Sequence, residues 1–157
     1  MHMENKMKKY LYLLFVAFLA TMPFAITSCG DDEDEPNSTT GKYELTINNK
    51  KYSFNKALPN GSAYDYTCIV SNNNDMLTFS IYNWDKVVTG TALTNKNFNL
   101  GWNSDKAVIG FPTSNTTVKV TAKDNQFVTI SFKNAKFEDL TGSELFTVNG
   151  TVKLPLK

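Results

Sequence analysis

From residue 42 onward, apolar and polar residues alternate with a period of two. In the first such segment, residues 43–47, apolar side chains at 43, 45 and 47 alternate with polar ones at 44 and 46. This alternation is typical of a strand with one buried and one wet face. Turn-forming Asn, Asp, Gly and Pro residues separate the repeats of the pattern, which fall at residues 52–54, 64–70, 76–84, 97–102, 107–111, 116–122, 127–133 and 145–154.

The pattern therefore predicts an all-β domain over residues 42–157, an antiparallel meander of about eight to ten short strands. No segment repeats apolar residues with a helical period over three turns. A break is expected at residues 59–62, where Pro, Asn, Gly and Ser follow one another. A barrel and a β-sandwich are both consistent with this alternation.

The chain begins in a different way. Lys6–Lys9 contains three lysines, and the apolar run Tyr10–Ile26 leads through small residues to Cys29. This is the layout of a secretory signal peptide. The run falls slightly short of the about 20 residues that span a bilayer. It is also interrupted by Pro23 and followed by no basic stop-transfer patch, so a retained membrane span is the weaker interpretation.

The segment Ile26-Thr27-Ser28-Cys29-Gly30 resembles the lipobox of bacterial lipoproteins. The resemblance implies that residues 1–28 are a cleaved signal peptide and that the thiol of Cys29 is acylated. Cys29 then becomes the first residue of the mature protein. Each buried methylene of an acyl chain contributes about 0.8 kcal/mol, and more than one chain gives stable attachment. The expected partner is thus a membrane, reached through an N-terminal lipid.

Five consecutive acidic residues follow the cysteine. Blocks of like charge extend and stay solvated, so residues 29–41 are expected to form a flexible tether. The run also resembles the export signal of Bacteroidetes lipoproteins, which implies a protein anchored in the outer membrane and facing the extracellular side. The two interpretations are compatible, and the residues concerned are Asp31, Asp32, Glu33, Asp34 and Glu35.

Charge and chemistry exclude several classes of function. From Gly41 onward the chain has 13 lysines and 9 acidic residues, a net charge of +4, and it contains no arginine. The guanidinium group of arginine can donate two parallel hydrogen bonds to phosphate or guanine. Because the chain lacks this group, no nucleic-acid partner is expected. The only histidine, His2, lies in the predicted signal peptide. The mature chain therefore has no histidine for a catalytic triad or a zinc site.

The remaining reactive side chains indicate structure rather than catalysis. Cys68 lies between Tyr66 and Val70 on an apolar strand face and is predicted to be a buried small hydrophobe. The acidic residues Glu138, Asp139 and Glu144 cluster around a loop, where exposed carboxylates are the default. The loop at residues 72–75 carries oxygen ligands without a recognisable calcium spacing. We expect a non-catalytic protein with no cofactor and no metal ion.

Aromatic residues offer the one candidate binding surface. A sugar ring stacks its C–H face on Trp or Tyr, and its hydroxyl groups pair with Asn and Asp. The candidate ligand-binding residues are Tyr82, Asn83, Trp84 and Asp85. Alternation places Tyr82 and Trp84 opposite the apolar face of their strand, toward solvent, a second layer or a barrel pocket, although structural packing is the favoured role. Trp102, in a similar Trp-Asn-Ser-Asp sequence, shares a face with apolar residues and is predicted to lie in the core.

The domain as a whole resembles small Bacteroidetes lipoprotein domains of unknown function, which have β-sandwich or lipocalin-like folds. The resemblance rests on the segments TINNKKYSFN, LTFSIYNWDKVVTGTALT, VTISFKNAKF and FTVNGTVKLPL. It implies no catalytic residues. Two function classes stay open. One is a surface binding module for glycans or another extracellular ligand. The other is a structural or accessory interaction protein, such as an adhesin or a subunit docking to other outer-membrane proteins.

Overall fold

Nine β-strands and one short 3-10 helix make up residues 39–157, the part of the chain that the computed structural model describes. These residues belong to one compact unit, and the segment that begins at residue 35 is called the 35–157 unit. The elements are β1 (Thr39–Ile47), β2 (Lys50–Gly61), β3 (Asp65–Ser71), β4 (Met76–Tyr82), η1 (Trp84–Lys86), β5 (Phe98–Asn103), β6 (Ala107–Pro112), β7 (Thr117–Lys123), β8 (Phe127–Glu138) and β9 (Glu144–Pro155).

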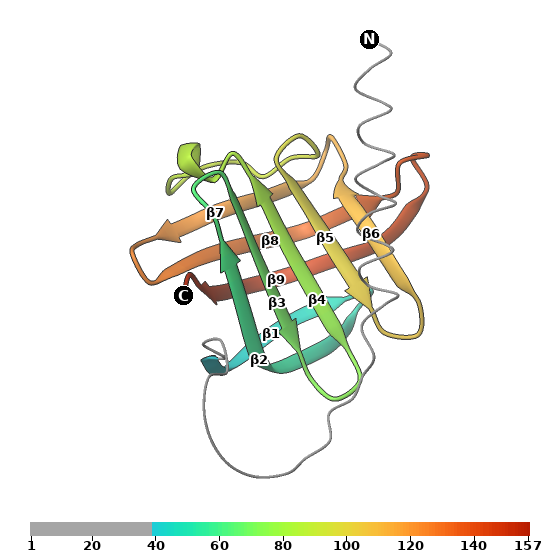
Figure 1. Cartoon of the computed structure of the whole chain (residues 1–157). Helices are drawn as coiled ribbons and strands as arrows, with labels where there is room; N and C mark the ends of the chain where they lie inside the picture. The colour runs from blue at the N-terminus through green and yellow to red at the C-terminus, as the bar shows by residue number, and fades with distance from the viewer. Residues whose placement is uncertain (1–38) are drawn as a thin grey trace. The chain divides into compact units, whose positions relative to one another are not determined.

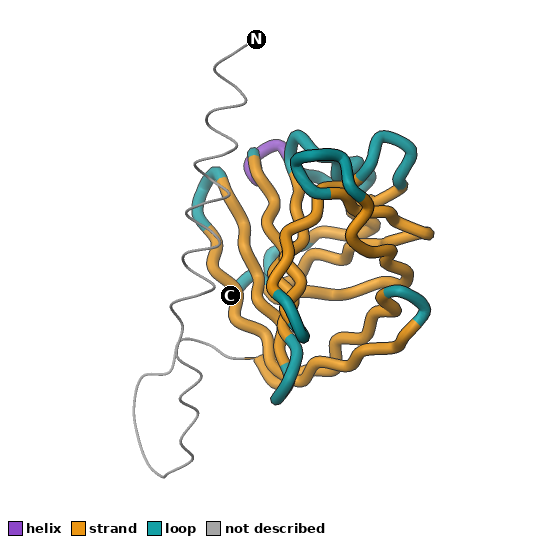
Figure 2. Tube along the Cα trace, turned by 90° about the vertical axis from the view of Figure 1, so that its right-hand side faces the viewer, coloured by secondary structure: helices purple, strands orange, loops and turns teal. Residues whose placement is uncertain are grey.

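Eight of the strands close into an antiparallel barrel (Figures 1 and 2). Hydrogen-bonded neighbours follow the order β6-β5-β4-β3-β2-β1-β9-β8, and the end of β8 pairs back onto β6. The ninth strand, β7, lies outside this ring and pairs with the first half of β8. The all-β meander is therefore confirmed, and its sheet closes on itself as a barrel.

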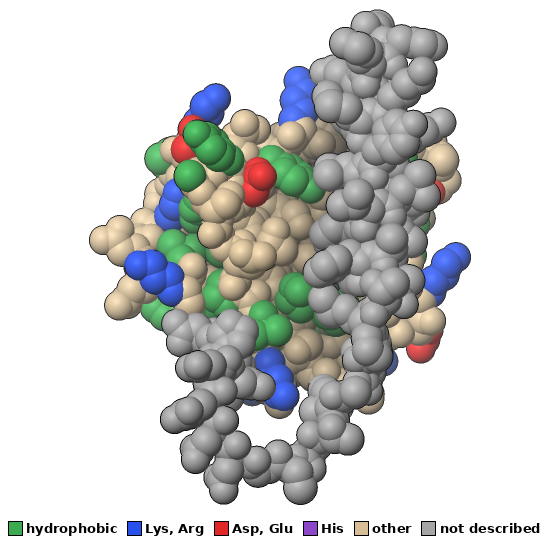
Figure 3. All heavy atoms as spheres, viewed as in Figure 1, with side chains coloured by type: hydrophobic (Ala, Val, Ile, Leu, Met, Phe, Trp, Pro, Cys, Tyr) green, Lys and Arg blue, Asp and Glu red, His purple; other side chains and the backbone are tan. Residues whose placement is uncertain are grey.

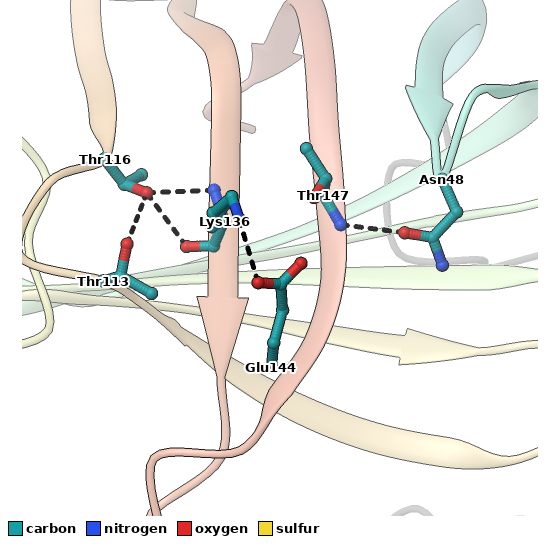
Figure 4. Close-up of polar contacts among 6 residues, drawn as sticks. All are labelled: Asn48, Thr113, Thr116, Lys136, Glu144 and Thr147. Atoms are coloured by element: carbon teal, nitrogen blue, oxygen red, sulfur yellow. Dashed lines mark hydrogen bonds and ion pairs between the residues drawn. The ribbon is translucent and has the colours of Figure 1, made fainter.

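The long strand β8 pairs with two strands along one side, because a bulge divides it. Asn134 adopts a left-handed conformation with φ of 44°, and the register with β9 shifts between Phe132 and Ala135. Past the bulge, the Lys136 N–H donates to the Thr116 hydroxyl at 2.9 Å, and that hydroxyl donates to the Lys136 carbonyl at 3.1 Å (Figure 4). A side chain thus satisfies the backbone of β8 between its pairings with β7 and β6.

The seam between β1 and β9 is short. Only Thr46 and Ile47 of β1 pair with β9. Asn48 extends this ladder by one step, because its N–H donates to the Thr147 carbonyl and its side-chain oxygen accepts the Thr147 N–H, both at 2.9 Å (Figure 4). Farther along β9, the buried Tyr66 hydroxyl donates to the Pro155 carbonyl at 2.6 Å. The far end of β9, which pairs with β8, is thereby also bonded to β3.

Aromatic side chains fill the barrel interior. Phe132 contacts Phe79, Phe98 and Phe137 with ring centroids 6.2 to 6.4 Å apart. Phe137 also stacks on Phe146 at 5.2 Å. An eight-stranded barrel has an interior just wide enough to be filled by side chains or to hold one small ligand. This barrel holds its own rings, which leaves the outside and the ends of the barrel as surfaces for a ligand.

Two expectations for the core are confirmed and one strand boundary is wrong. Cys68 is fully buried and Trp102 is 9% exposed, in edge contact with Tyr52 and Phe54. The break expected at residues 59–62 does not occur, because β2 continues through Pro59 to Gly61. Proline is tolerated there because the pairing of β1 with β2 ends at Ala57, which leaves Pro59 bonded to β3 alone among the described strands.

Gly110 faces the rings of the barrel interior and has no room for a side chain. A Cβ atom at this position would lie 2.7 Å from the Cβ of Phe137 and 3.0 Å from Cζ of Phe146. We expect Gly110→Ala to lower the free energy of unfolding by about 1–3 kcal/mol, because β6 must move away from β8 to make room. Urea unfolding of the 35–157 unit measures this change.

Gly61→Ala is the matched control for that substitution. Its added Cβ would meet Tyr66 at 3.8 Å, an ordinary van der Waals distance. We expect a change near zero or a gain of about 0.4–1 kcal/mol from the stiffer unfolded chain. If both variants lose the same free energy of unfolding, strand propensity, and not the contact with Phe137, causes the destabilisation.

Candidate ligand surface at one end of the barrel

The turn after β4 brings two loops together at one end of the barrel, where the 3-10 helix lies among the loops in Figure 2. Asn83 takes a left-handed conformation with φ of 56°, which ends β4 and starts η1. Asn is among the few residues that adopt this conformation readily. The Trp84 N–H then donates to the Tyr64 carbonyl at 2.7 Å. The loop before β3 is thereby fixed to the loop after β4.

The ring of Trp84 packs on the protein itself. It stacks on Tyr66 with centroids 4.8 Å apart, and the Lys123 ammonium lies 3.8 Å from its centroid. Lys123 also donates to the carbonyls of Trp84 at 3.3 Å and Val87 at 2.7 Å. Partial burial lowers the pKa of Lys123 from its ordinary value. Trp84 therefore covers the barrel end as a half-buried packing residue, as the favoured interpretation of the sequence proposed.

The expected position of Trp84 on a strand is wrong. The alternation that places Tyr82 and Trp84 on one face requires β4 to run to Trp84, but β4 ends at Tyr82. Tyr82 does lie on the outer face of the barrel. Its hydroxyl accepts a hydrogen bond from the Asn99 amide at 2.7 Å, and burial raises its pKa. The left-handed turn at Asn83 separates the two aromatic residues.

Tyr64 is the exposed aromatic residue at this end of the barrel, and the alternation pattern misplaced it. The pattern puts Tyr64 on the apolar face with Tyr66, but Tyr64 precedes β3 and is 71% exposed. Its backbone is held by the Ser62 hydroxyl, which accepts the N–H groups of Tyr64 at 3.3 Å and Asp65 at 2.9 Å. The Ser62–Asp65 turn signal could have located it in a loop.

Two of the predicted site residues, Asn83 and Asp85, flank Trp84, whose N–H bonds to the Tyr64 carbonyl. The side chains of Asn83 and Asp85 are exposed and make no hydrogen bond within residues 42–157. We call Tyr64, Asn83 and Asp85 the Tyr64 surface. It combines one exposed ring on a braced loop with an amide and a carboxylate whose hydrogen-bonding capacity is unused. This is the combination that stacks on and hydrogen-bonds to a polyhydroxylated ligand.

The other reactive side chains have structural partners. Burial raises the pKa of the Cys68 thiol to about 12, which keeps it protonated and unreactive at neutral pH. Asp139 accepts hydrogen bonds from Thr141 and Ser143, and the Thr141 hydroxyl lowers its pKa most. Glu144 pairs with Lys136 at 3.0 Å (Figure 4). The acidic loop is therefore organised by its own contacts.

The loop at residues 72–75 is an Asx turn. The side-chain oxygen of Asn72 accepts the N–H groups of Asn74 at 2.8 Å and Asp75 at 2.7 Å, which uses the atom that a cation would need. Across the described part of the chain, no group of three or more His, Cys, Asp or Glu side chains is arranged to hold a metal ion.

The predicted lipidation site and export signal lie outside the described residues. Cys29 and the acidic residues 31–35 both precede Thr39, where the described chain begins. Within residues 39–157, no helix has the length and apolar character needed to cross a membrane. Comparison of the chain with protein families, with curated proteins and with solved structures found no match.

Proposed function

We propose that this protein is a lipid-anchored binding module of the outer membrane that faces the medium and holds a glycan or another extracellular ligand without catalysing a reaction on it. The N-terminal pattern supports the location, because a lipobox-like segment and an acidic run precede the domain. The barrel is consistent with the role of a binder, because its own rings fill the interior while Asp139 and Glu144 of the acidic loop bond to Thr141 and Lys136.

The observation that carries the proposal is the exposure of Tyr64. Large aromatic side chains in proteins are mostly buried, and Tyr and Trp on rigid exposed loops supply contact area at a small entropic penalty. Tyr64 is 71% exposed, and its loop is fixed by Ser62 and by the Trp84 N–H. The free amide of Asn83 and carboxylate of Asp85 suit the hydroxyl groups of a sugar.

Removal of the Tyr64 ring tests the proposal. A glycan array probed with the 35–157 unit selects the ligand, and titration calorimetry measures its affinity. We expect Tyr64→Ala to weaken binding at least about tenfold, the loss of one stacked ring, while stability changes by less than about 0.5 kcal/mol. Tyr64→Phe keeps the ring and is expected to retain most of the affinity.

Tyr52→Ala is not a suitable control, because Tyr52 contacts Trp102 in the core. Leu58→Ala is a better one, since Leu58 is 41% exposed on β2, outside the Tyr64 surface. A Tyr64→Ala variant that binds like the parent, or a domain that captures no glycan, would contradict the glycan-binding role of this surface.

A second function class, a structural or accessory interaction protein, is favoured by a different part of the barrel. The outer face of β3–β6 is uncharged over most of its area, which is typical of surfaces buried in protein assemblies. Adhesion or docking to other outer-membrane proteins is therefore the alternative function.

A further inference from the structure

The outer face of strands β7–β9 carries lysines and no acidic residue. Core residues such as Val118, Ile130 and Val152 point inward, so their strand neighbours point outward. The paired segments 117–123, 127–133 and 149–155 contain four lysines and neither Asp nor Glu. We call the outward lysines and the hydroxyl side chains among them the lysine face: Lys119, Lys133, Lys153, Thr117, Ser131 and Thr151.

Backbone pairing brings the three lysines together on adjacent strands. Lys119 pairs with Ser131, two residues before Lys133, so the two lysines are diagonal neighbours. Such neighbours lie about 7–8 Å apart. On its other side Ser131 pairs with Thr151, two residues before Lys153. The face therefore presents positive charges on three strands with hydroxyl groups between them.

The charges of Lys119 and Lys133 are not compensated within residues 39–157. Both residues are exposed, and neither side chain makes an ion pair or a hydrogen bond in this part of the chain. The ion pairs found there use other lysines, namely Lys42, Lys51 and Lys136. Two free positive charges on neighbouring strands therefore face the solvent.

The third lysine has contacts of its own. The Lys153 ammonium lies 4.1 Å from the centroid of the half-buried Phe127 ring. Asp124, in the turn between β7 and β8, also senses this lysine. The N–H groups of Gln126 and Phe127 lower the pKa of Asp124 most, and the charge of Lys153 lowers it further. The charge of Lys153 is thus partly compensated.

The lysine face belongs to one side of the barrel. Figure 1 shows β7, β8 and β9 behind β3 and β4, so their outward residues face away from that wall. Figure 3 views the molecule from the side of β3 and β4, and the lysines visible there lie around the rim. The three segments of the lysine face carry four of the 13 lysines that follow residue 41 and none of the 9 acidic residues.

We propose that the lysine face binds an acidic polysaccharide, a sugar chain that carries carboxylate or sulfate groups. Charge complementarity selects an anion, and lysines on three strands suit a chain with repeated charges better than one small anion. Lysine acts as a compact point charge, so the face attracts charge without selecting the geometry of a phosphate or a base. The hydroxyl groups of Ser131 and Thr151 can donate to and accept from those of a sugar.

An anionic membrane fits the lysine face less well than a polysaccharide. Five acidic residues, 31–35, closely follow the proposed anchor at Cys29, and an anionic lipid surface would repel them. A polysaccharide in the medium meets no such repulsion at the anchor. The inference extends the proposed glycan binding to a second surface, formed by residues other than those of the Tyr64 surface.

Dextran sulfate and dextran test the proposal, because they share a backbone and differ in charge. The 35–157 unit is expected to bind dextran sulfate and polygalacturonate at low salt and to leave dextran unbound. Lys119→Gln combined with Lys133→Gln is expected to weaken dextran sulfate binding about tenfold or more. The slope of log affinity against log salt should fall by about two, one for each lost charge contact.

Lys56→Gln combined with Lys106→Gln is the matched control. Both lysines are exposed, on β2 and in the turn between β5 and β6, and the pair removes the same total charge. This variant is expected to keep its affinity for dextran sulfate within about threefold, because screening confines the attraction to nearby charges. Urea unfolding of both double variants is expected to match the parent.

Three results would overturn the proposal. The first is a parent unit that binds neither dextran sulfate nor polygalacturonate. The second is an equal loss of affinity in the two double variants, which would make the attraction a property of net charge. The third is tighter binding to phosphatidylglycerol vesicles or to single-stranded DNA, which would assign the face to a membrane or a nucleic acid. Tyr64→Ala keeps the lysine face and is expected to bind dextran sulfate like the parent, so a failure here is distinguishable from a failure of glycan binding at the Tyr64 surface.

Discussion

Replacement of Cys29 by Ala is expected to block lipidation and to leave the protein unprocessed or mislocalised. The proposed anchor consists of acyl chains on this cysteine, and each buried methylene contributes about 0.8 kcal/mol to membrane binding. Ala carries no thiol, so no acyl chain can be attached and the N-terminal segment should not be cleaved at this position. Metabolic labelling with a palmitate analogue, membrane fractionation and the mass of the mature N-terminus report these effects directly.

Cys68→Ala is the matched control, because Cys68 is the other cysteine of the chain and is fully buried in the barrel. It should be labelled, processed and fractionated like the parent. Normal processing and lipid labelling of the Cys29→Ala variant would rule out the lipoprotein assignment. Protease treatment of intact cells then tests separately whether the anchored protein faces the medium.

The period-two pattern predicted the strands because alternation reports directly which side chains meet the core. Residues 43–47 and 66–70 follow it in the structure, with every second side chain buried inside the barrel. In β4 the inward Leu77, Phe79 and Ile81 follow it too, but the outward Thr78 and Ser80 are also buried. Cys68 and Trp102 were placed correctly for the same reason. The number of strands followed from the spacing of turn residues. These features are local, so one sequence is enough to predict them.

The pattern could not distinguish a barrel from a sandwich, because the strands of both architectures show the same alternation of apolar and polar residues. Closure depends on which distant strands pair, here β8 with β6 and β9 with β1. The bulge at Asn134 divides β8 between β7 and β6, and the Asn48 side chain extends the β1–β9 seam. Such contacts join residues far apart in sequence, and no local period encodes them.

The candidate site was predicted only in part because alternation fails where strands end. Asn83 turns into the left-handed region, so Trp84 leaves the strand and packs on Tyr66 and Lys123. Tyr64 was assigned to a strand face although it lies in the loop before β3. Exposure at loop ends depends on tertiary neighbours, which explains why the sequence selected Trp84 and overlooked Tyr64.

Phe79→Ala is expected to produce the largest loss of stability among the substitutions considered, about 3–5 kcal/mol. Phe79 is fully buried on β4, and its ring lies 6.4 Å from that of Phe132. Truncation removes a whole ring from the barrel interior and leaves a cavity that paired strands on both sides of β4 prevent from collapsing. Urea unfolding followed by intrinsic fluorescence measures the change in the free energy of unfolding.

Trp84→Ala and Tyr64→Ala complete a graded series with Phe79→Ala. Trp84 loses its stack on Tyr66 and its cation–π contact with Lys123, which together are worth about 1–2 kcal/mol. Tyr64 is exposed, and its removal should change stability by less than about 0.5 kcal/mol. The expected loss of stability is therefore largest for Phe79→Ala, smaller for Trp84→Ala and smallest for Tyr64→Ala. For the loss of ligand affinity we expect the reverse order.

The series distinguishes a packing role from a binding role at each aromatic residue. If Trp84→Ala leaves stability unchanged and lowers ligand affinity more than Tyr64→Ala does, Trp84 is the binding ring and its contacts with Tyr66 and Lys123 carry little energy. If Tyr64→Ala instead destabilises the barrel as much as Trp84→Ala, the loop before β3 packs more closely than its 71% exposure indicates. The Tyr64 surface then loses its stacking platform, and the uncharged outer face becomes the stronger guide to function.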